Sequence, residues 1–126
     1  MLLVDDEGPI VGALSRVLRG HGFVVRTATT GADALLALSE EVPAVMLLDI
    51  NLPDLTGWEV LRRMSPTERA RVPVIVFSAA AVAPSRLHEF QPAGVLIKPF
   101  PFDALQRLLD RFIDPAPTAH HAARGS

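Results

Sequence analysis

Cysteine is absent from the 126-residue chain. A chain without thiols cannot be a disulfide scaffold, bind a metal through thiolates or use a cysteine nucleophile. Its apolar runs all fall short of the roughly 18 residues that a transmembrane helix needs, so no membrane span is predicted. The opening residues, MLLVDDE, lack the basic segment of a signal peptide. We therefore expect a protein of a reducing compartment, the cytoplasm.

Clusters of basic residues are also missing. Twelve Lys and Arg residues face fourteen Asp and Glu residues, and the net charge is −2. Affinity for phosphate-rich surfaces needs clustered Lys and Arg, so direct binding to nucleic acid or to an anionic membrane is not predicted. Hydrophobic residues make up 49% and charged residues 21% of the chain, which is typical of one globular domain and argues against disorder.

Short apolar segments alternate with helical patterns along the chain. Strands are predicted at 1–5, 23–28, 44–49, 73–79 and 94–98. A first helix is predicted after Pro9, ending at Gly20 or Gly22, and a second at 31–41. A third is predicted after Thr56, with Trp58, Leu61 and Met64 on one face. A weak helix is predicted at 84–91 and an amphipathic one from Phe102 to Phe112. Five strand–helix repeats predict an α/β fold, with a doubly wound parallel sheet covered on both faces.

In the first helix Ile10, Leu14, Val17 and Leu18 recur at helical spacing.

Residues 114–126, DPAPTAHHAARGS, are rich in Ala and Pro and lack apolar periodicity. We expect this tail to be a disordered linker or a remnant of protein expression, and its two histidines are left out of the candidate site.

Polar residues close four of the five predicted strands. Asp5 and Asp6 follow the first strand, Asp49 ends the third, Ser78 the fourth and Lys98 the fifth. Because the carboxyl ends of parallel strands meet at one edge of a sheet, these side chains are expected to share a crevice there.

The expected charges in this crevice indicate a cation. Two carboxylates about 5 Å apart repel by roughly 3 kcal/mol at an effective dielectric constant near 20. Lys98 supplies one positive charge, and all-oxygen ligands favour Mg²⁺ or Mn²⁺ for the rest. Asp49 is then a candidate nucleophile toward phosphorus. Lys98 and Ser78 would stabilise the oxygens of the transferred group.

Four segments resemble one family, the receiver domain of bacterial two-component response regulators: LLVDDE, LLDINLPDLTGWEVL, PVIVFSA and IKPF. The resemblance covers residues 1–113. It implies a flavodoxin-like (βα)5 fold with strand order 2-1-3-4-5. It also implies that a sensor histidine kinase or a histidine phosphotransfer protein phosphorylates Asp49.

The resemblance assigns a role to each candidate residue. Asp6, Asp49 and the backbone carbonyl of Asn51 would hold Mg²⁺, and Asp5 would act through a water molecule. Ser78 would be the switch hydroxyl.

Lys98 would contact the phosphoryl group and precede a cis peptide bond to Pro99. Asn51 and Ala80 occupy positions that tune the lifetime of the phosphoryl group. Ile10 and the loop at Pro99 and Phe100 lie where kinases dock in the family.

Two departures from the family pattern affect the switch. Val95 stands where the family has Tyr or Phe, and residues 80–94 form a short connection, so the fourth helix is expected to be stunted or displaced. In the family, the face formed by the fourth helix, fifth strand and fifth helix often makes a homodimer. An alternative function is therefore a degenerate receiver that binds proteins independently of phosphorylation.

Two further alternatives use the same fold or chemistry. A hydrolase of the haloacid-dehalogenase type needs a second aspartate two residues after the nucleophile, where this chain has Asn51. A flavin-binding module needs a phosphate loop rich in Ser, Thr and Gly after the first strand, where this chain has DDEGP. We expect no enzymatic activity beyond the domain's own phosphotransfer and autodephosphorylation.

Overall fold

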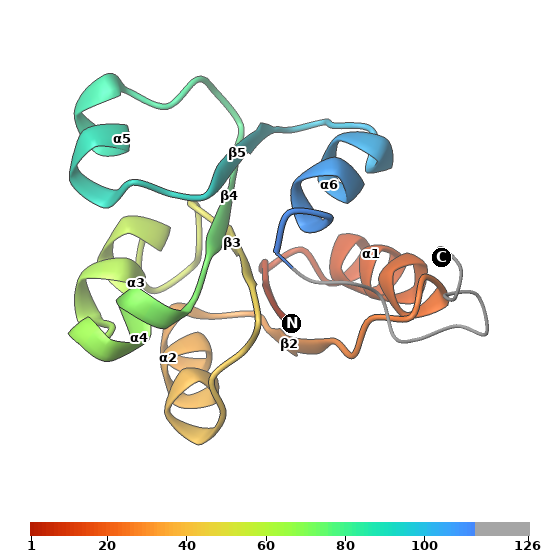
Figure 1. Cartoon of the computed structure of the whole chain (residues 1–126), viewed down its shortest axis with the longest axis horizontal. Helices are drawn as coiled ribbons and strands as arrows, with labels where there is room; N and C mark the ends of the chain where they lie inside the picture. Colours follow the sequence, from red (N-terminus) through yellow and green to blue (C-terminus); the bar gives the residue numbers. More distant parts are fainter. Residues whose placement is uncertain (113–126) are drawn as a thin grey trace.

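The computed structural model describes residues 1–112, so the predicted tail at 114–126 lies outside the described residues. The described residues form five strands and six helices, with one helix after each strand except the third, which two helices follow (Figure 1). The strands are β1 (Leu2–Val4), β2 (Arg26–Ala28), β3 (Met46–Asp49), β4 (Val74–Ser78) and β5 (Gly94–Ile97). The helices are α1 (Gly8–Gly20), α2 (Gly31–Glu40), α3 (Gly57–Arg63), α4 (Pro66–Arg71), α5 (Pro84–Phe90) and α6 (Phe102–Leu109).

The strands form one parallel sheet in the order β2-β1-β3-β4-β5. This confirms the predicted doubly wound sheet and its strand order. In the central register Val4 pairs with Leu48, so the residues that follow these two strands leave the sheet at the same edge.

Alternating side chains of the strands pack into two hydrophobic cores, one on each face of the sheet. Leu3, Leu47 and Ile75 point into one core with α1 and α6. Leu2, Met46 and Val74 point into the other with α2 and α3. Figure 1 shows α1 and α6 on one side of the sheet and α2 to α5 on the other. Strands covered on both faces are apolar throughout, as the sequence shows.

The connection between β3 and β4 contains two helices where one was predicted. Met64 is the C-cap of α3, and the next residue, Ser65, is the N-cap of α4. Ser65 and Glu68 form a capping box, in which the Ser65 hydroxyl accepts from the Glu68 N–H and the Glu68 carboxylate accepts from the Ser65 N–H. No residue of α4 is buried, so this helix has no apolar periodicity by which to predict it. Its caps, with Pro66 in the first turn, were the available signal.

Two predicted elements differ in detail. In α1, Val11 and Leu18 are buried, whereas Ile10 and Val17 are each 42% exposed. β2 begins at Arg26, later than predicted, although Phe23 before it is buried in the core.

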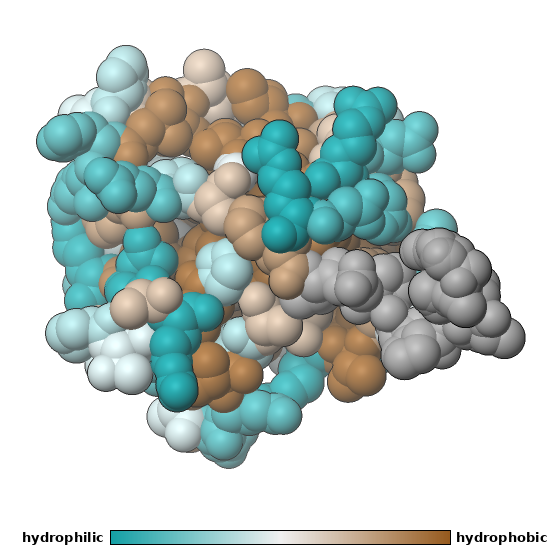
Figure 2. All heavy atoms as spheres, viewed as in Figure 1, coloured by the Kyte–Doolittle hydropathy of each residue, from teal (hydrophilic) through white to brown (hydrophobic). Residues whose placement is uncertain are grey.

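No helix within residues 1–112 is long and apolar enough to cross a membrane. On the face drawn in Figure 2, hydrophobic and hydrophilic residues are interspersed.

The weak helix predicted at 84–91 is present as α5, which buries only Phe90. The Phe90 ring stacks on Trp58 of α3, with centroids 5.0 Å apart and planes at 20°. Arg62 of α3 pairs with Glu89 at 3.1 Å. Arg69 of α4 donates to the Phe90 carbonyl at 2.6 Å, so α5 is attached through its C-terminal end to α3 and α4.

Candidate functional site

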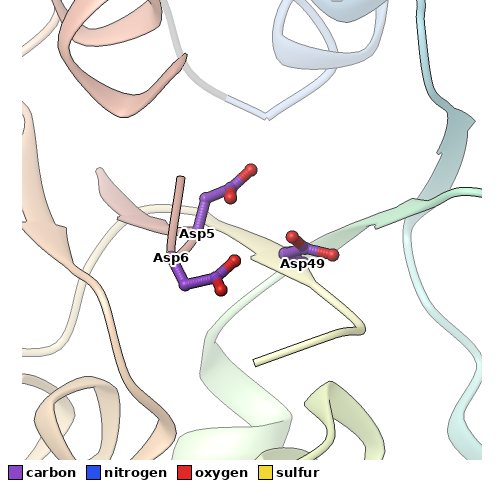
Figure 3. A group of neighbouring side chains, drawn as sticks. All are labelled: Asp5, Asp6 and Asp49. Atoms are coloured by element: carbon purple, nitrogen blue, oxygen red, sulfur yellow. The ribbon is translucent and has the colours of Figure 1, made fainter. Parts of the chain in front are cut away.

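Three carboxylates meet at the edge of the sheet where β1 and β3 end (Figure 3). Asp5 and Asp6 follow β1, and Asp49 is the last residue of β3. One oxygen of each lies within 4.8 Å of the others. Asp5 and Asp49 are 1% and 4% exposed, whereas Asp6 is exposed. The structure thus brings together the three acids that the sequence placed in one crevice.

The backbone fixes the two buried carboxylates in the same way. Asp5 Oδ1 accepts from the Glu7 N–H at 3.0 Å, and Asp49 Oδ1 accepts from the Asn51 N–H at 3.0 Å. In each case the amide comes from the residue two positions ahead, where the chain turns away from the strand. Each aspartate therefore keeps its second oxygen, Oδ2, for other partners.

Lys98, which follows β5, bridges those two oxygens. Its Nζ donates to Asp5 Oδ2 at 2.8 Å and to Asp49 Oδ2 at 3.0 Å, and it lies 3.5 Å from Glu7 Oε1. Burial pushes the pKa of Lys98 down, but the bonds and charges of Asp5 and Asp49 outweigh it, so the net pKa shift is upward. The lysine stays cationic, and the cluster still carries more acid than base.

Burial is also the main influence on Asp49. It raises the pKa of the Asp49 carboxyl, and the charge of Asp5 acts in the same direction. The Asn51 amide and Lys98 oppose this shift. A positive charge added beside Asp49 would therefore favour its ionised, nucleophilic form.

Within the described residues, the side-chain hydrogen bonds of Ser78 lie outside this cluster. Ser78 ends β4, and its hydroxyl hydrogen-bonds to the backbone of Ala80, which is exposed. The Ser78 carbonyl accepts from the Lys98 N–H at 2.8 Å, which fixes the start of the lysine's loop. Val95 is half-buried in β5 opposite Val76. The Lys98–Pro99 peptide bond is cis.

A tight turn holds the loop after Asp49. Asn51 forms an isolated bridge with Thr56, and the Gly57 N–H donates to the Ile50 carbonyl at 2.7 Å. A Cβ on Gly57 would lie 2.7 Å from the carbonyl oxygen of Asp49, so only glycine allows α3 to begin this close to the strand.

Two charged residues of this region were not singled out from the sequence. Glu7 follows the acidic pair and reaches Lys98, and Asp54 in the loop caps α2 by accepting from the Gly31 and Ala32 N–H groups. Adjacency to Asp6 was a signal for Glu7. For Asp54 no local signal existed, because its partners lie more than 20 residues earlier.

A hydrophobic groove opens beside the cluster. It has a volume of about 400 Å³ and lies between α1 and the segment that joins β5 to α6. Asp5 and Lys98 line it together with apolar side chains: Ile10, Leu14, Val17, Phe77, Phe100 and Phe102. Ile10 and Val17, exposed on α1, therefore belong to the wall of a concave surface rather than to the core.

The donor set suits a hard divalent cation. All three acids offer oxygen, and the described cluster includes neither imidazole nor thiolate, which are the ligands that favour zinc. Asp6 is the accessible member, and Asp49 reaches the cluster from the neighbouring strand. The residues present therefore fit Mg²⁺.

Comparison with known proteins gives one consistent result. The family model described as the response regulator receiver domain matches residues 1–110. The transcriptional regulatory protein PrrA of Mycobacterium tuberculosis is 37% identical over 102 residues, which are 79% of this chain and 43% of PrrA. KdpE of the same organism is 38% identical over 105 residues, 82% of this chain and 46% of KdpE. The chain thus spans less than half the length of these relatives.

Solved structures match almost the whole described fold. TrrA of Thermotoga maritima, determined in complex with Mg²⁺–BeF, superposes with a TM-score of 0.78 at 27% identity, covering 89% of this chain and 96% of TrrA. CheY4 of Vibrio cholerae gives a TM-score of 0.79 at 28% identity, with the same coverage. With its acidic cluster at the carboxyl edge of a 2-1-3-4-5 sheet, the chain belongs to the response regulator receiver domain family of two-component systems.

Proposed function

We propose that this receiver domain accepts a phosphoryl group on Asp49 and uses the modification to change a protein-binding surface. The observation that carries the proposal is the position of Asp49, which is buried at the end of β3 and lies beside Asp5, Asp6 and Lys98. Asp49 would attack phosphorus through a carboxylate oxygen. The bond from phosphorus to the donor's histidine nitrogen breaks, that nitrogen keeps the electron pair, and an acyl phosphate forms on Asp49.

Each neighbour has a distinct part in this transfer. Asp6, Asp49 and the Asn51 carbonyl would hold Mg²⁺, with Asp5 acting through water. Bound there, Mg²⁺ supplies positive charge that neutralises the transferring group. Lys98 already contacts Asp49 and would follow the new charge, and Ser78 would turn its hydroxyl from Ala80 to a phosphoryl oxygen.

The groove between α1 and the β5–α6 segment is proposed as the docking surface for the donor. It opens beside Asp5 and Lys98, and its wall is apolar. An amphipathic helix of a histidine kinase or phosphotransfer protein could lay its apolar face there and present its histidine to Asp49. We propose a cytoplasmic location and no turnover of external substrates; the domain would catalyse only its own phosphorylation and dephosphorylation.

Intact-mass measurement after incubation with Mg²⁺ and acetyl phosphate tests the proposal. The wild-type chain should gain one phosphoryl group, and Asp49→Asn should gain none. Omitting Mg²⁺ should suppress the gain. A wild-type chain that stays unmodified, under conditions that phosphorylate another receiver domain, would instead favour the phosphorylation-independent binding module.

A further inference from the structure

A single exposed carboxylate, Asp54, ties the loop after Asp49 to the start of α2. Its Oδ1 accepts from the Gly31 N–H at 2.7 Å, and its Oδ2 accepts from the Ala32 N–H at 3.0 Å. Oδ1 also accepts from the Leu55 N–H at 2.9 Å, within the loop. The Gly31 and Ala32 amides lower the pKa of the Asp54 carboxyl, which keeps it ionised at neutral pH.

An apolar contact reinforces this tie. Gly31 is buried, and a Cβ on it would come within 2.9 Å of the Leu55 side chain. Leu55 in turn packs against the core that α2 shares with α3. The loop therefore lies directly on the first turn of α2, with a polar and an apolar contact side by side.

The same loop contains a proposed metal ligand. At its base, the Asn51–Thr56 bridge and the bond from Gly57 to Ile50 close the turn. At its far end, the Asp54 carboxylate is the one group of the loop that bonds to the amides of α2, among the hydrogen bonds of residues 1–112. The carbonyl of Asn51 is thus held by a turn that is restrained at both ends.

We propose that Asp54 is a positioning residue for the divalent cation, acting through the Asn51 carbonyl and not by contact with the ion. This inference rests on the proposed function. A backbone carbonyl adds to metal affinity in proportion to how well it is held in place before binding, because ordering a mobile loop costs conformational entropy. Releasing the loop from α2 should therefore weaken the cation site while leaving its carboxylates intact.

The chain offers a matched control at the same helix end. Thr30 is the N-cap of α2, and its hydroxyl accepts from the Asp33 N–H at 3.0 Å. Thr30→Ala removes a cap from the same first turn but leaves the carboxylate that comes from the loop. Both substitutions weaken the start of α2, and only Asp54→Ala detaches the loop.

The test is Mg²⁺ affinity by titration calorimetry on the wild type, Asp54→Ala, Asp54→Asn and Thr30→Ala, alongside denaturant unfolding of each. We expect Asp54→Ala to weaken Mg²⁺ binding about tenfold, the low end of the loss typical of outer-shell changes. Asp54→Asn, which keeps one acceptor oxygen, should lose less, and Thr30→Ala should bind as the wild type does. Amide exchange at residues 51–55 in metal-free protein should accelerate in Asp54→Ala and not in Thr30→Ala.

The outcomes separate this inference from the proposed function. Wild-type affinity in Asp54→Ala, or an equal loss in Thr30→Ala, overturns the positioning role and leaves the phosphoacceptor role standing. A wild-type chain that takes up no Mg²⁺ overturns both. If Asp54→Ala does not fold, the comparison of Asp54→Asn with Thr30→Ala decides the question, because Asp54→Asn keeps the size of the side chain.

Discussion

Lys98 Nζ lies 2.8 Å from Asp5 Oδ2, and that carboxylate is almost fully buried. The same ammonium also bonds to Asp49, so one side chain just after β5 compensates two acids at the ends of β1 and β3. Removing it would leave two buried carboxylates without the ammonium that pairs with both of them.

Lys98→Met should therefore lower the free energy of unfolding in metal-free buffer by about 2 kcal/mol. This is less than the roughly 3–5 kcal/mol of a fully buried broken pair, since the lysine is partly exposed. Added Mg²⁺ should recover part of the loss, because it brings positive charge to the same acids. Denaturant unfolding with and without Mg²⁺ measures both effects. Arg107→Met, which removes an exposed cation on α6, is the control, and an equal loss there would contradict the prediction.

The raised pKa of Asp49 predicts a specific pH dependence of stability. A carboxyl whose folded-state pKa lies above its unfolded value of about 3.9 stabilises the fold fully below that value. The contribution is lost as the pH rises through the folded-state pKa, because ionising the buried group is costly. In metal-free buffer, Asp49→Asn should lack this loss. Its free energy of unfolding should therefore increase relative to that of the wild type as the pH rises from 3.5 to 7. Parallel stability curves for the two proteins would refute this interpretation. Asp103→Asn, at an exposed position of α6, provides the reference.

Gly57 should tolerate no side chain. In Gly57→Ala the new Cβ would meet the Asp49 carbonyl and the Ile50 backbone, neither of which can move without shifting the end of β3 and the Asp49 side chain. We expect a loss of about 1–3 kcal/mol in unfolding free energy, as for overpacked sites. Gly12→Ala is the matched control, because its Cβ meets nothing closer than the Arg16 guanidinium at 3.9 Å. Within helix α1 it should stabilise by about 0.5–1 kcal/mol, so the two changes should shift denaturation midpoints in opposite directions.

Ile10 tests the docking surface separately from the chemistry. Ile10→Ala removes apolar area from the groove wall and leaves the carboxylates and Lys98 untouched. Phosphorylation by acetyl phosphate should be unchanged, because a small donor needs no groove. Transfer from a histidine phosphotransfer protein should lose about 1 kcal/mol of binding, or roughly fivefold in affinity. Leu36 is an exposed apolar residue on α2. Leu36→Ala should leave both the phosphorylation by acetyl phosphate and the affinity for the phosphotransfer protein unchanged.

Much of this architecture could be predicted because strong local signals and the topology agree. Apolar runs that end in Asp5, Asp49 and Lys98 mark strands, and parallel pairing then brings their ends together. Helix α4 was missed because it buries no side chain, so the periodicity used to find helices is absent from it. The Asp54 contact could not be predicted for another reason: it depends on how the loop lies against α2 in three dimensions.

The face-to-face rings of Trp58 and Phe90 have a practical consequence. The chain contains one tryptophan and no tyrosine, so its ultraviolet emission arises from a single indole. That indole stacks on the Phe90 ring and lies 5.9 Å from the Arg86 guanidinium, and both neighbours belong to α5. Any displacement of α5 would alter the polarity around the fluorophore, which gives the protein a native optical reporter for this helix.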